Sequence, residues 1–229
     1  MPRVLFLLGG GHGALEAVQA AFLRAAGPDP RLVLLLQGGL RWERYLPLYT
    51  NPWIRRGIRR YRVIVPDADG TLDLERAARA LREATGIFIG GGHTGLYQKH
   101  YATEPLGSLI RTRYRQGVPV AGLSAGAILA SSLAWLLPEE SPSGRIEVIP
   151  GLGLIQGMIV APHFSEWNAL PDLLEAMRRS RVSQGLGIDE EAVVVFENER
   201  VQEVYGGSAY RVALTGPGRG AYRLERWPW

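Results

Sequence analysis

The sequence predicts an α/β protein whose mostly parallel central sheet is flanked by helices on both faces, in three layers. Short runs that are apolar throughout alternate along the chain with segments of helical length, which is the pattern of a buried parallel sheet. Most of these runs are followed by glycine, where the chain can turn toward the next helix. With 229 residues, 46% of them hydrophobic, the chain can bury a large core, and we expect a single domain over residues 1–229.

The first half of the chain is expected to alternate between strands and helices. The strands are expected at residues 4–8, 32–36, 61–65, 86–89 and 118–121. The helices are expected at residues 14–26, 41–56, 72–84 and 94–116. Asp73 fits the N-cap of the third helix, where its side chain would accept a hydrogen bond from a free backbone amide.

The second half of the chain is richer in β-structure. It opens with a polar loop at residues 138–144, and one helix is expected at residues 165–180. The β-rich stretches are residues 147–155, 158–160 and 186–188, followed by a hairpin of 193–196 with 200–205. We therefore expect an extra β-rich part C-terminal to the parallel sheet.

Composition excludes several classes of protein. The mean hydropathy is near zero and no run of 18 apolar residues occurs, so we expect neither a disordered chain nor a membrane protein. The start of the chain runs from Met1-Pro2-Arg3 directly into a strand-like segment with no cleavage-site pattern, so we expect a cytoplasmic protein. The absence of cysteine excludes thiolate nucleophiles, disulfides and cysteine zinc sites.

The basic residues give a net charge of +4, but their distribution does not predict nucleic-acid binding. All of them are Arg except Lys99. Such a preference for arginine is more typical of genome-wide or thermophilic composition than of a binding surface. One dense segment, residues 55–62, would place four arginines on one face if it were helical. We favour a solvated or subunit-facing surface for this segment over a phosphate-binding one.

A nucleophile motif follows the fifth expected strand. Gly122-Leu123-Ser124-Ala125-Gly126 matches G-x-S-x-G and lies between a strand and a helix, which is the context of a nucleophile elbow. The flanking glycines let the chain turn tightly, and the N-terminus of the helix favours a developing negative charge. Ser124 is therefore the candidate nucleophile; the alternative is a Gly-rich turn that only packs the helix on the strand.

A serine nucleophile needs a general base, and the chain has four histidines. His163 follows a short expected strand and precedes a helix, downstream of the elbow, which makes it the best-placed base. His100 lies within an expected helix, and we expect it at the surface. The base in turn needs a carboxylate that fixes its tautomer. Three acids directly follow an apolar strand end: Asp189, Glu190 and Glu191.

Two backbone N–H groups that point at one spot would form an oxyanion hole. The amide of Ala125, directly after the candidate nucleophile, is one such donor by the geometry of the elbow. The glycine run 90–92 ends the neighbouring expected strand, where residues without side chains let an amide approach a substrate. A third glycine run, residues 9–13, follows the first strand. All three lie at the carboxyl ends of expected strands, where sheets of this class bind ligands.

Four motifs together resemble one family of enzymes. They are GGGHT at 90–94, GLSAGA at 122–127, PHF at 162–164 and GLGIDEEA at 185–192. In kind, order and approximate spacing they resemble the serine peptidase family of aspartyl dipeptidase (peptidase E) and cyanophycinase, from the first strand to about Tyr210. The resemblance implies a class I glutamine amidotransferase-like, flavodoxin-like three-layer fold. A glutaminase is disfavoured because that chemistry on this fold uses a cysteine nucleophile, which the chain lacks.

Carried over position by position, the resemblance implies a Ser–His–Glu triad. Ser124 would be the nucleophile, His163 the base and Glu190 the orienting acid. Glu139, in the loop after the helix of the elbow, is a weaker candidate for the acid. The implied reaction is acyl transfer, in which the serine attacks a peptide carbonyl and water then hydrolyses the acyl-enzyme.

The resemblance also implies the surroundings of the triad. Gly92 and Ala125 would supply the oxyanion amides. The residues expected to contact substrate are Gly91, His93, Thr94 and Trp167. The resemblance implies neither a metal nor a cofactor, and homodimers are a habit of the family.

This chain departs from the family pattern around the substrate. His93 stands where the family has Asn, and Pro162 stands where cyanophycinase-like members carry a polar side chain. Those members follow the His-Phe pair with closely spaced arginines that hold the substrate's aspartate, and this chain has no arginine there before Arg178. We therefore expect the catalytic machinery without that acidic-residue pocket. Trp167 is then either an apolar or aromatic wall of the site or a core residue.

Three other functions are open as alternatives. Residues 9–14 match the G-x-G-x-x-A fingerprint of dinucleotide-binding proteins, but no acid follows the second expected strand. His12, His93 and His163 could bind zinc in a metal hydrolase, although no metal-ligand spacing supports this. The third alternative is a catalytically inactive or regulatory ligand-binding relative. The favoured function is a serine peptidase that cleaves small peptides or isopeptides, with no nucleic-acid or membrane partner.

Overall fold

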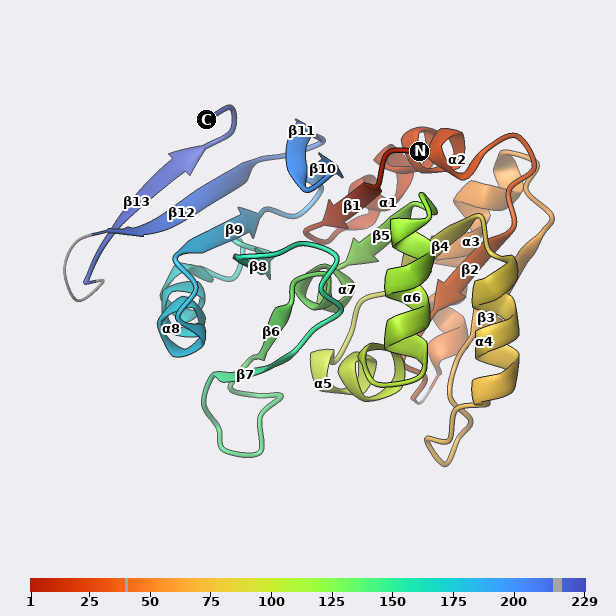
Figure 1. Ribbon diagram of the computed structural model, residues 1–229, viewed down its shortest axis with the longest axis horizontal. Helices are drawn as coiled ribbons and strands as arrows, with labels where there is room; N and C mark the ends of the chain where they lie inside the picture. The colour runs from red at the N-terminus through yellow and green to blue at the C-terminus, as the bar shows by residue number, and fades with distance from the viewer. Residues whose placement is uncertain (40, 216–219) are drawn as a thin grey trace.

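A seven-stranded sheet forms the centre of the computed structural model, which describes residues 1–39, 41–215 and 220–229 (Figure 1). The strand order is β11-β10-β1-β5-β4-β2-β3. Five strands run parallel: β1 (Val4–Leu8), β2 (Leu32–Leu35), β3 (Tyr61–Ile64), β4 (Gly86–Ile89) and β5 (Val120–Leu123). At one edge β10 (Val193–Glu197) pairs antiparallel with β1, and β11 (Arg200–Tyr205) pairs antiparallel with β10. The predicted mostly parallel α/β sheet is confirmed.

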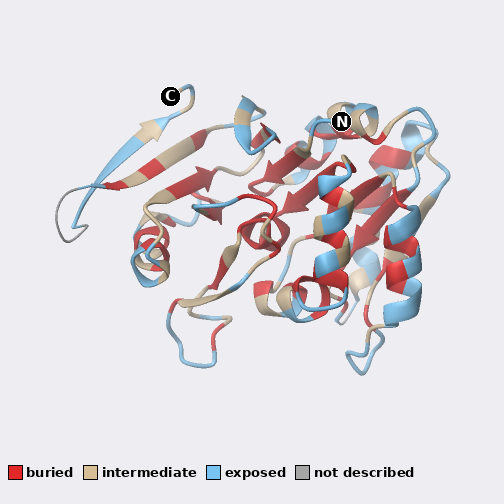
Figure 2. Ribbon diagram, in the orientation of Figure 1, coloured by how far each residue is buried: buried red, intermediate tan, exposed pale blue. Residues whose placement is uncertain are grey.

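Helices cover both faces of this sheet. One face carries α1 (His12–Ala17), α2 (Gln19–Ala26) and α3 (Leu46–Arg55), and the other carries α4 (Leu74–Glu83) and α6 (Leu106–Arg115) (Figure 1). Alternate residues of a strand face opposite layers, so Leu5 and Leu7 of β1 pack with the α4–α6 layer while Phe6 and Leu8 pack with the α1–α3 layer. This explains why the central strands are apolar throughout and almost entirely buried (Figure 2).

Two of the expected helices are divided. The expected helix at 14–26 is α1 and α2, which meet at Val18. The expected helix at 94–116 is α5 (Thr94–Tyr97), the π-helical turn η2 (Gln98–Ala102) and α6. Pro105 contributes to this break, because proline has no amide hydrogen and disfavours a helical residue before it. Asp73 caps α4 as expected and accepts a hydrogen bond of 2.9 Å from the amide of Arg76.

The expectation that His100 lies at the surface is wrong. Its position in the π-helical turn places it inside, where it is 8% exposed. Burial, with a smaller contribution from the charge of Lys99, lowers the pKa of His100.

The basic segment at 55–62 is not a helix. The expected helix at 41–56 is the short 3-10 helix η1 (Trp42–Arg44) followed by α3, which ends at Arg55. Gly57 then adopts a φ of 79° and β3 follows. Arginines of the segment form ion pairs on the surface, Arg55–Glu16, Arg56–Glu16, Arg60–Asp29 and Arg62–Glu83. A solvated surface therefore accounts for these arginines, and each exposed pair contributes at most about 1 kcal/mol.

A second sheet contains part of the predicted β-rich region. The expected stretches at 158–160 and 186–188 lie in it, whereas the expected hairpin of 193–196 with 200–205 joins the central sheet as β10 and β11. The other two strands of the second sheet, Ala209–Thr215 and Ala221–Arg226, lie in segments where no strand was expected. Its strand order is β13 (Ala221–Arg226), β12 (Ala209–Thr215), β9 (Gln184–Ile188) and β8 (Met158–Pro162), of which β8 and β9 are parallel. A separate hairpin joins β6 (Leu133–Leu136) to β7 (Glu147–Pro150), so β7 is shorter than the expected stretch at 147–155. Helix α8 (Leu170–Ser180) begins five residues later than expected, which leaves residues 165–169 as a turn.

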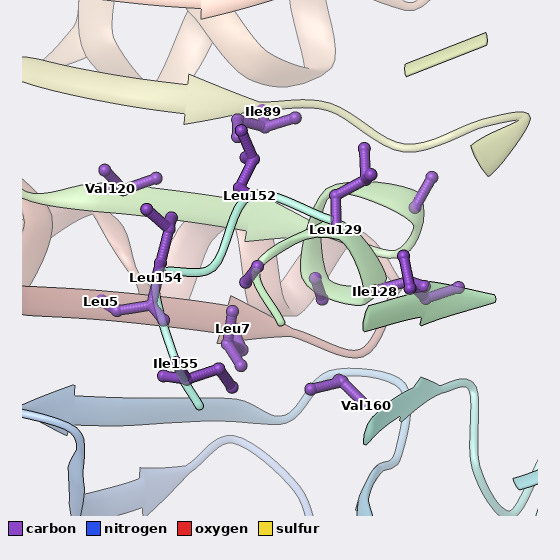
Figure 3. Close-up of a cluster of buried hydrophobic side chains, with 14 of the residues drawn as sticks. Leu5, Leu7, Ile89, Val120, Ile128, Leu129, Leu152, Leu154, Ile155 and Val160 are labelled. Carbon is purple, nitrogen blue, oxygen red and sulfur yellow. The ribbon is translucent and has the colours of Figure 1, made fainter. Parts of the chain in front are cut away.

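One cluster of buried side chains is shared by the two sheets (Figure 3). Leu5 and Leu7 of β1 lie in it together with Val160 of β8, and the segment that follows β7 adds Leu152 and Leu154. This shared core fixes the carboxyl end of β8 relative to those of β1 and β5. No helix among the described residues is long and apolar enough to cross a membrane.

Two buried tyrosines differ in whether their hydroxyl groups form hydrogen bonds. The hydroxyl of Tyr101 donates to the carbonyl oxygen of Leu36 at 2.6 Å, whereas the buried hydroxyl of Tyr114 has no hydrogen-bond partner among the described residues. Burial raises the pKa of Tyr114 to about 12, so its hydroxyl is neutral. We predict that Tyr101→Phe lowers the free energy of unfolding by about 1–3 kcal/mol, because a buried carbonyl loses its donor. We predict that Tyr114→Phe changes it by less than about 0.5 kcal/mol.

Urea unfolding of the two variants measures this difference. An equal decrease in the free energy of unfolding for Tyr114→Phe would contradict the prediction. Both substitutions remove a hydroxyl oxygen, and the two hydroxyls differ in their hydrogen bonding.

Candidate active site

Ser124 lies at a sharp turn between β5 and α7 (Ala125–Leu129). Its φ of 52° and ψ of −110° are values that residues with a side chain rarely adopt, as expected of a nucleophile elbow. A methyl group on Gly122 would overlap the carbonyl oxygen of Gly126, and one on Gly126 would overlap that of Ile89. The close packing of the turn therefore requires both glycines of the G-x-S-x-G motif.

A continuous chain of hydrogen bonds links the three residues expected to form a triad. Ser124 Oγ lies 2.9 Å from His163 Nε2, and His163 Nδ1 lies 2.7 Å from Glu190 Oε1. His163 follows β8 and Glu190 follows β9, and because these strands are parallel neighbours their carboxyl ends meet at one edge. With the proton on Nδ1 facing the carboxylate, Nε2 can accept the hydroxyl proton of Ser124.

The three consecutive acids after β9 have different partners. Glu190 faces His163, whereas Asp189 accepts hydrogen bonds from the amide of Ser165 at 3.0 Å and from the hydroxyl of Tyr210 at 3.2 Å. Asp189 therefore braces the turn that follows His163. The weaker candidate for the acid, Glu139, is exposed in the loop between β6 and β7. Among the described residues, no hydrogen bond or ion pair links Glu139 to His163, whose Nδ1 faces Glu190 instead.

Residues close to the expected triad occupy the space beside the first glycine run. A methyl group on Gly10 would overlap the ring of His163, and one on Gly11 would overlap the carboxylate of Glu191. The carbonyl oxygen of Gly10 also accepts the amide of Glu191 at 3.1 Å. This run occupies the predicted edge of the sheet, but its glycines make room for His163 and the acid loop. That packing accounts for the dinucleotide-like spacing.

The second glycine run lies beside the serine. The amide of Gly91 donates to the hydroxyl of Tyr49 at 3.1 Å, and its carbonyl accepts from the hydroxyl of Tyr97 at 3.1 Å. Burial raises the pKa of both tyrosines, so they are neutral phenols that can accept and donate. In the described part of the chain, neither the amide of Gly92 nor that of Ala125 donates a hydrogen bond. Both are therefore free to bind an oxyanion.

Two side chains that no sequence motif marks hold the residues after this run. The amide of His93 donates to Oε1 of Gln37 at 2.5 Å, and the amide of Thr94 donates to Oε1 of Glu140 at 2.7 Å. Nδ1 of His93 itself accepts a hydrogen bond of 3.1 Å from the amide of Gly95, which makes His93 the N-cap of α5. Both Gln37 and Glu140 come from loops distant in sequence, and no motif marks them.

Two cavities meet at Gly92. A small cavity of about 90 Å³ is lined by Gly92, Thr94, Ser124, Ile128, Trp135, Leu137, Glu140, Pro162, Trp167 and Ala169. A larger cavity of about 470 Å³, on the side of α1 and α3, has Gly91, Gly92 and Leu123 in its wall together with the aromatic rings of Trp42, Tyr45 and Tyr49. Space for bound groups is therefore available on both sides of Gly92.

Trp167 belongs to the wall of the small cavity, and the alternative that it packs in the core is wrong. It is 54% exposed, in the turn before α8. Its ring stacks on the ring of His163 with a centroid separation of 3.9 Å and an interplanar angle of 9°. This contact holds the plane of the imidazole from the side facing solvent.

The histidines do not gather into a metal site. Among the described residues, no group of three or more His, Cys, Asp or Glu side chains is arranged to hold a metal ion. His163 engages both ring nitrogens within the triad, His12 lines the larger cavity and His93 caps α5. The zinc alternative therefore lacks the donor set that it needs.

Comparisons with known proteins identify the family of this chain. Residues 69–204 match the model of peptidase family S51. A cyanophycinase of Geminocystis herdmanii is 34% identical over 130 residues, which is 55% of this chain and 48% of that protein. An uncharacterized peptidase of Bacillus subtilis, YgaJ, is 27% identical over 133 residues, which is 56% of each chain. This chain spans about half the length of the curated relatives it matches.

The fold recurs among solved structures. The crystal structure of a peptidase from an acI-B1 Actinobacterium superposes with a TM-score of 0.70 at 21% identity, covering 98% of this chain and 94% of the other. At that identity the likeness concerns the fold, while the family follows from the matched model, which includes Ser124, His163 and Glu190. The chain belongs to peptidase family S51.

Proposed function

We propose that this protein is a serine peptidase that hydrolyses small peptides or isopeptides through an acyl-enzyme on Ser124. The observation that carries the proposal is the hydrogen-bond chain from Ser124 through His163 to Glu190, beside two backbone amides that have no other partner. Membership of family S51 supports the general class of reaction.

The proposed reaction follows from the positions of these groups. Ser124 Oγ attacks the carbonyl carbon of the substrate while its proton passes to Nε2 of His163. The carbonyl oxygen becomes an oxyanion that accepts hydrogen bonds from the amides of Gly92 and Ala125. His163 then gives the proton to the leaving amine, the C–N bond breaks, and the acyl group stays on Ser124. Water, deprotonated by His163, hydrolyses the ester and restores the serine.

Glu190 and Trp167 are proposed to hold the base in position. The carboxylate of Glu190 keeps the proton of the neutral imidazole on Nδ1 and stabilises the imidazolium that forms during attack. The indole of Trp167 lies flat on the same ring and restricts its rotation. An aromatic face also attracts the positive charge that the ring carries in each transition state.

The two cavities support a peptide as the substrate. A chain bound across Gly92 would place one side of the attacked bond in the small cavity and the other toward the larger, aromatic one. No arginine or lysine is among the lining residues that the structure describes for either cavity. This supports a specificity different from that of relatives that hold aspartate with arginines.

Labelling by a fluorophosphonate probe tests the nucleophile. We predict that the wild-type protein is phosphonylated, and that Ser124→Ala and His163→Ala abolish the labelling. Glu190→Gln should slow it by about 10²–10⁴-fold, because the tautomer of His163 is no longer fixed. Circular dichroism checks that each variant is folded. An unlabelled wild type, at probe concentrations that label a control hydrolase, would favour a catalytically inactive, regulatory relative instead.

Substitution of Gly10 tests whether the end of β1 positions the base. We predict that Gly10→Ala slows phosphonylation by about 10²-fold, since the new methyl group overlaps the ring of His163 and must displace it. Gly220→Ala is the matched control, because no atom of the described residues lies within 4 Å of a methyl group there. A Gly10→Ala variant that is folded and reacts like the wild type would show that His163 does not depend on this contact.

Substitution of Trp167 tests the stacking. We expect Trp167→Ala to lower the rate of phosphonylation by about tenfold and Trp167→Phe to restore most of it, because a phenyl ring can also stack on the imidazole. Tyr222→Ala, at an exposed aromatic residue of β13, should keep the wild-type rate. Equal rates for Trp167→Ala and the wild type would remove Trp167 from the positioning of the base.

A further inference from the structure

The carboxylate of Glu140 is only half satisfied. Oε1 accepts the amide of Thr94 at 2.7 Å, while Oε2 is buried and has no hydrogen-bond partner among the described residues. The side chain is 11% exposed and lines the small cavity that also contains Ser124. A buried carboxylate oxygen without a partner is costly, so a group in the cavity that donates a hydrogen bond to Oε2 would be stabilised there.

The charge of Glu140 is not neutralised by its neighbours. Among the described residues, the basic side-chain nitrogen within 4 Å of this carboxylate is Nδ1 of His93, at 3.9 Å from Oε1. That nitrogen accepts the hydrogen bond of the Gly95 amide, so in this arrangement it carries no proton to offer Glu140.

The rest of the cavity suits a compact organic cation. Apart from Thr94 and Ser124, its other lining residues are glycine or apolar and aromatic residues, and they include the indoles of Trp135 and Trp167. The N–H of Trp135 is already donated to the carbonyl of Val160, so this indole offers the cavity no free donor. The volume of about 90 Å³ corresponds to roughly three water molecules. A small group whose positive charge meets the carboxylate and whose carbon atoms meet the rings would fit there.

We infer that Glu140 binds a cationic group of the substrate, an ammonium or guanidinium carried by the residue beside Ser124. This inference rests on the proposed peptidase function and names the substrate class. The cation has two possible sources, the free α-amino group of an N-terminal residue or the side chain of a lysine or arginine. In either case the small cavity has the opposite charge preference from a site that uses arginines to hold aspartate.

Four fluorogenic amides of aminomethylcoumarin separate the two sources: those of lysine, N-acetyl-lysine, norleucine and N-acetyl-norleucine. Norleucine matches the lysine side chain without its ammonium group. We predict that the wild type prefers a cationic member over the doubly neutral N-acetyl-norleucine amide by about 10²-fold in kcat/KM. Preference for N-acetyl-lysine assigns the side chain as the source, and preference for norleucine with a free amine assigns the α-amino group.

The Glu140→Gln variant tests the residue. Its amide oxygen can still accept the hydrogen bond of Thr94, so the change mainly removes the negative charge. The ratio of kcat/KM between the preferred cationic substrate and N-acetyl-norleucine amide should fall by about 10²-fold. Glu139→Gln, which removes a neighbouring charge outside the cavity, should keep the ratio within about threefold. Equal losses on cationic and neutral substrates in Glu140→Gln would overturn the inference.

A binding measurement keeps this inference separate from the proposed catalysis. Calorimetry on the Ser124→Ala variant compares lysinamide with acetylated norleucinamide, and needs no turnover. Tighter binding of lysinamide supports the cationic site even if the wild type fails to react with a fluorophosphonate, in which case only the peptidase proposal fails. Equal binding of the two amides, with a wild type that does react, overturns the cationic site and leaves the peptidase proposal standing.

Discussion

The candidate active site depends on close packing between the backbone segments that follow three neighbouring strands. At the carboxyl ends of β1, β5 and β4 the chain carries glycines, and added methyl groups would overlap His163 at Gly10 and backbone carbonyl oxygens at Gly122 and Gly126. The missing side chains let a strained serine, an imidazole and a free amide occupy one small volume. The buried strands behind them supply the rigid support that such strain requires.

The triad also depends on the contact between the two sheets. Ser124 belongs to the parallel sheet, whereas His163 and Glu190 follow strands of the second sheet. Their alignment at 2.9 and 2.7 Å therefore requires that the sheets be fixed against each other. The shared apolar core fixes the two sheets relative to each other, and the packing of Gly10 against His163 does the same at the edge of the site. The proposed triad is thus built across an interface between two sheets of one chain.

The sequence predicted those features that depend on local pattern. Apolar runs located the parallel strands, and the motifs around Ser124, His163 and Glu190 selected residues that the fold brings into hydrogen-bond distance. Features that depend on distant packing were not predictable. Gln37 and Glu140 reach the loop after β4 from loops without any motif, and His100 is buried because a helix that looked continuous is broken by a π-helical turn. The glycine run at 9–13 follows β1 as expected, but its role in accommodating His163 depends on tertiary structure.

In the proposed mechanism, Ser124, His163 and the amides of Gly92 and Ala125 form a site ready to stabilise an oxyanion. A crystal structure of the protein after reaction with a fluorophosphonate tests it most directly. We expect phosphorus bonded to Oγ of Ser124, with the phosphoryl oxygen about 2.7–3.1 Å from both amide nitrogens. Phosphorus on another residue, or a phosphoryl oxygen turned away from Gly92 and Ala125, would contradict it.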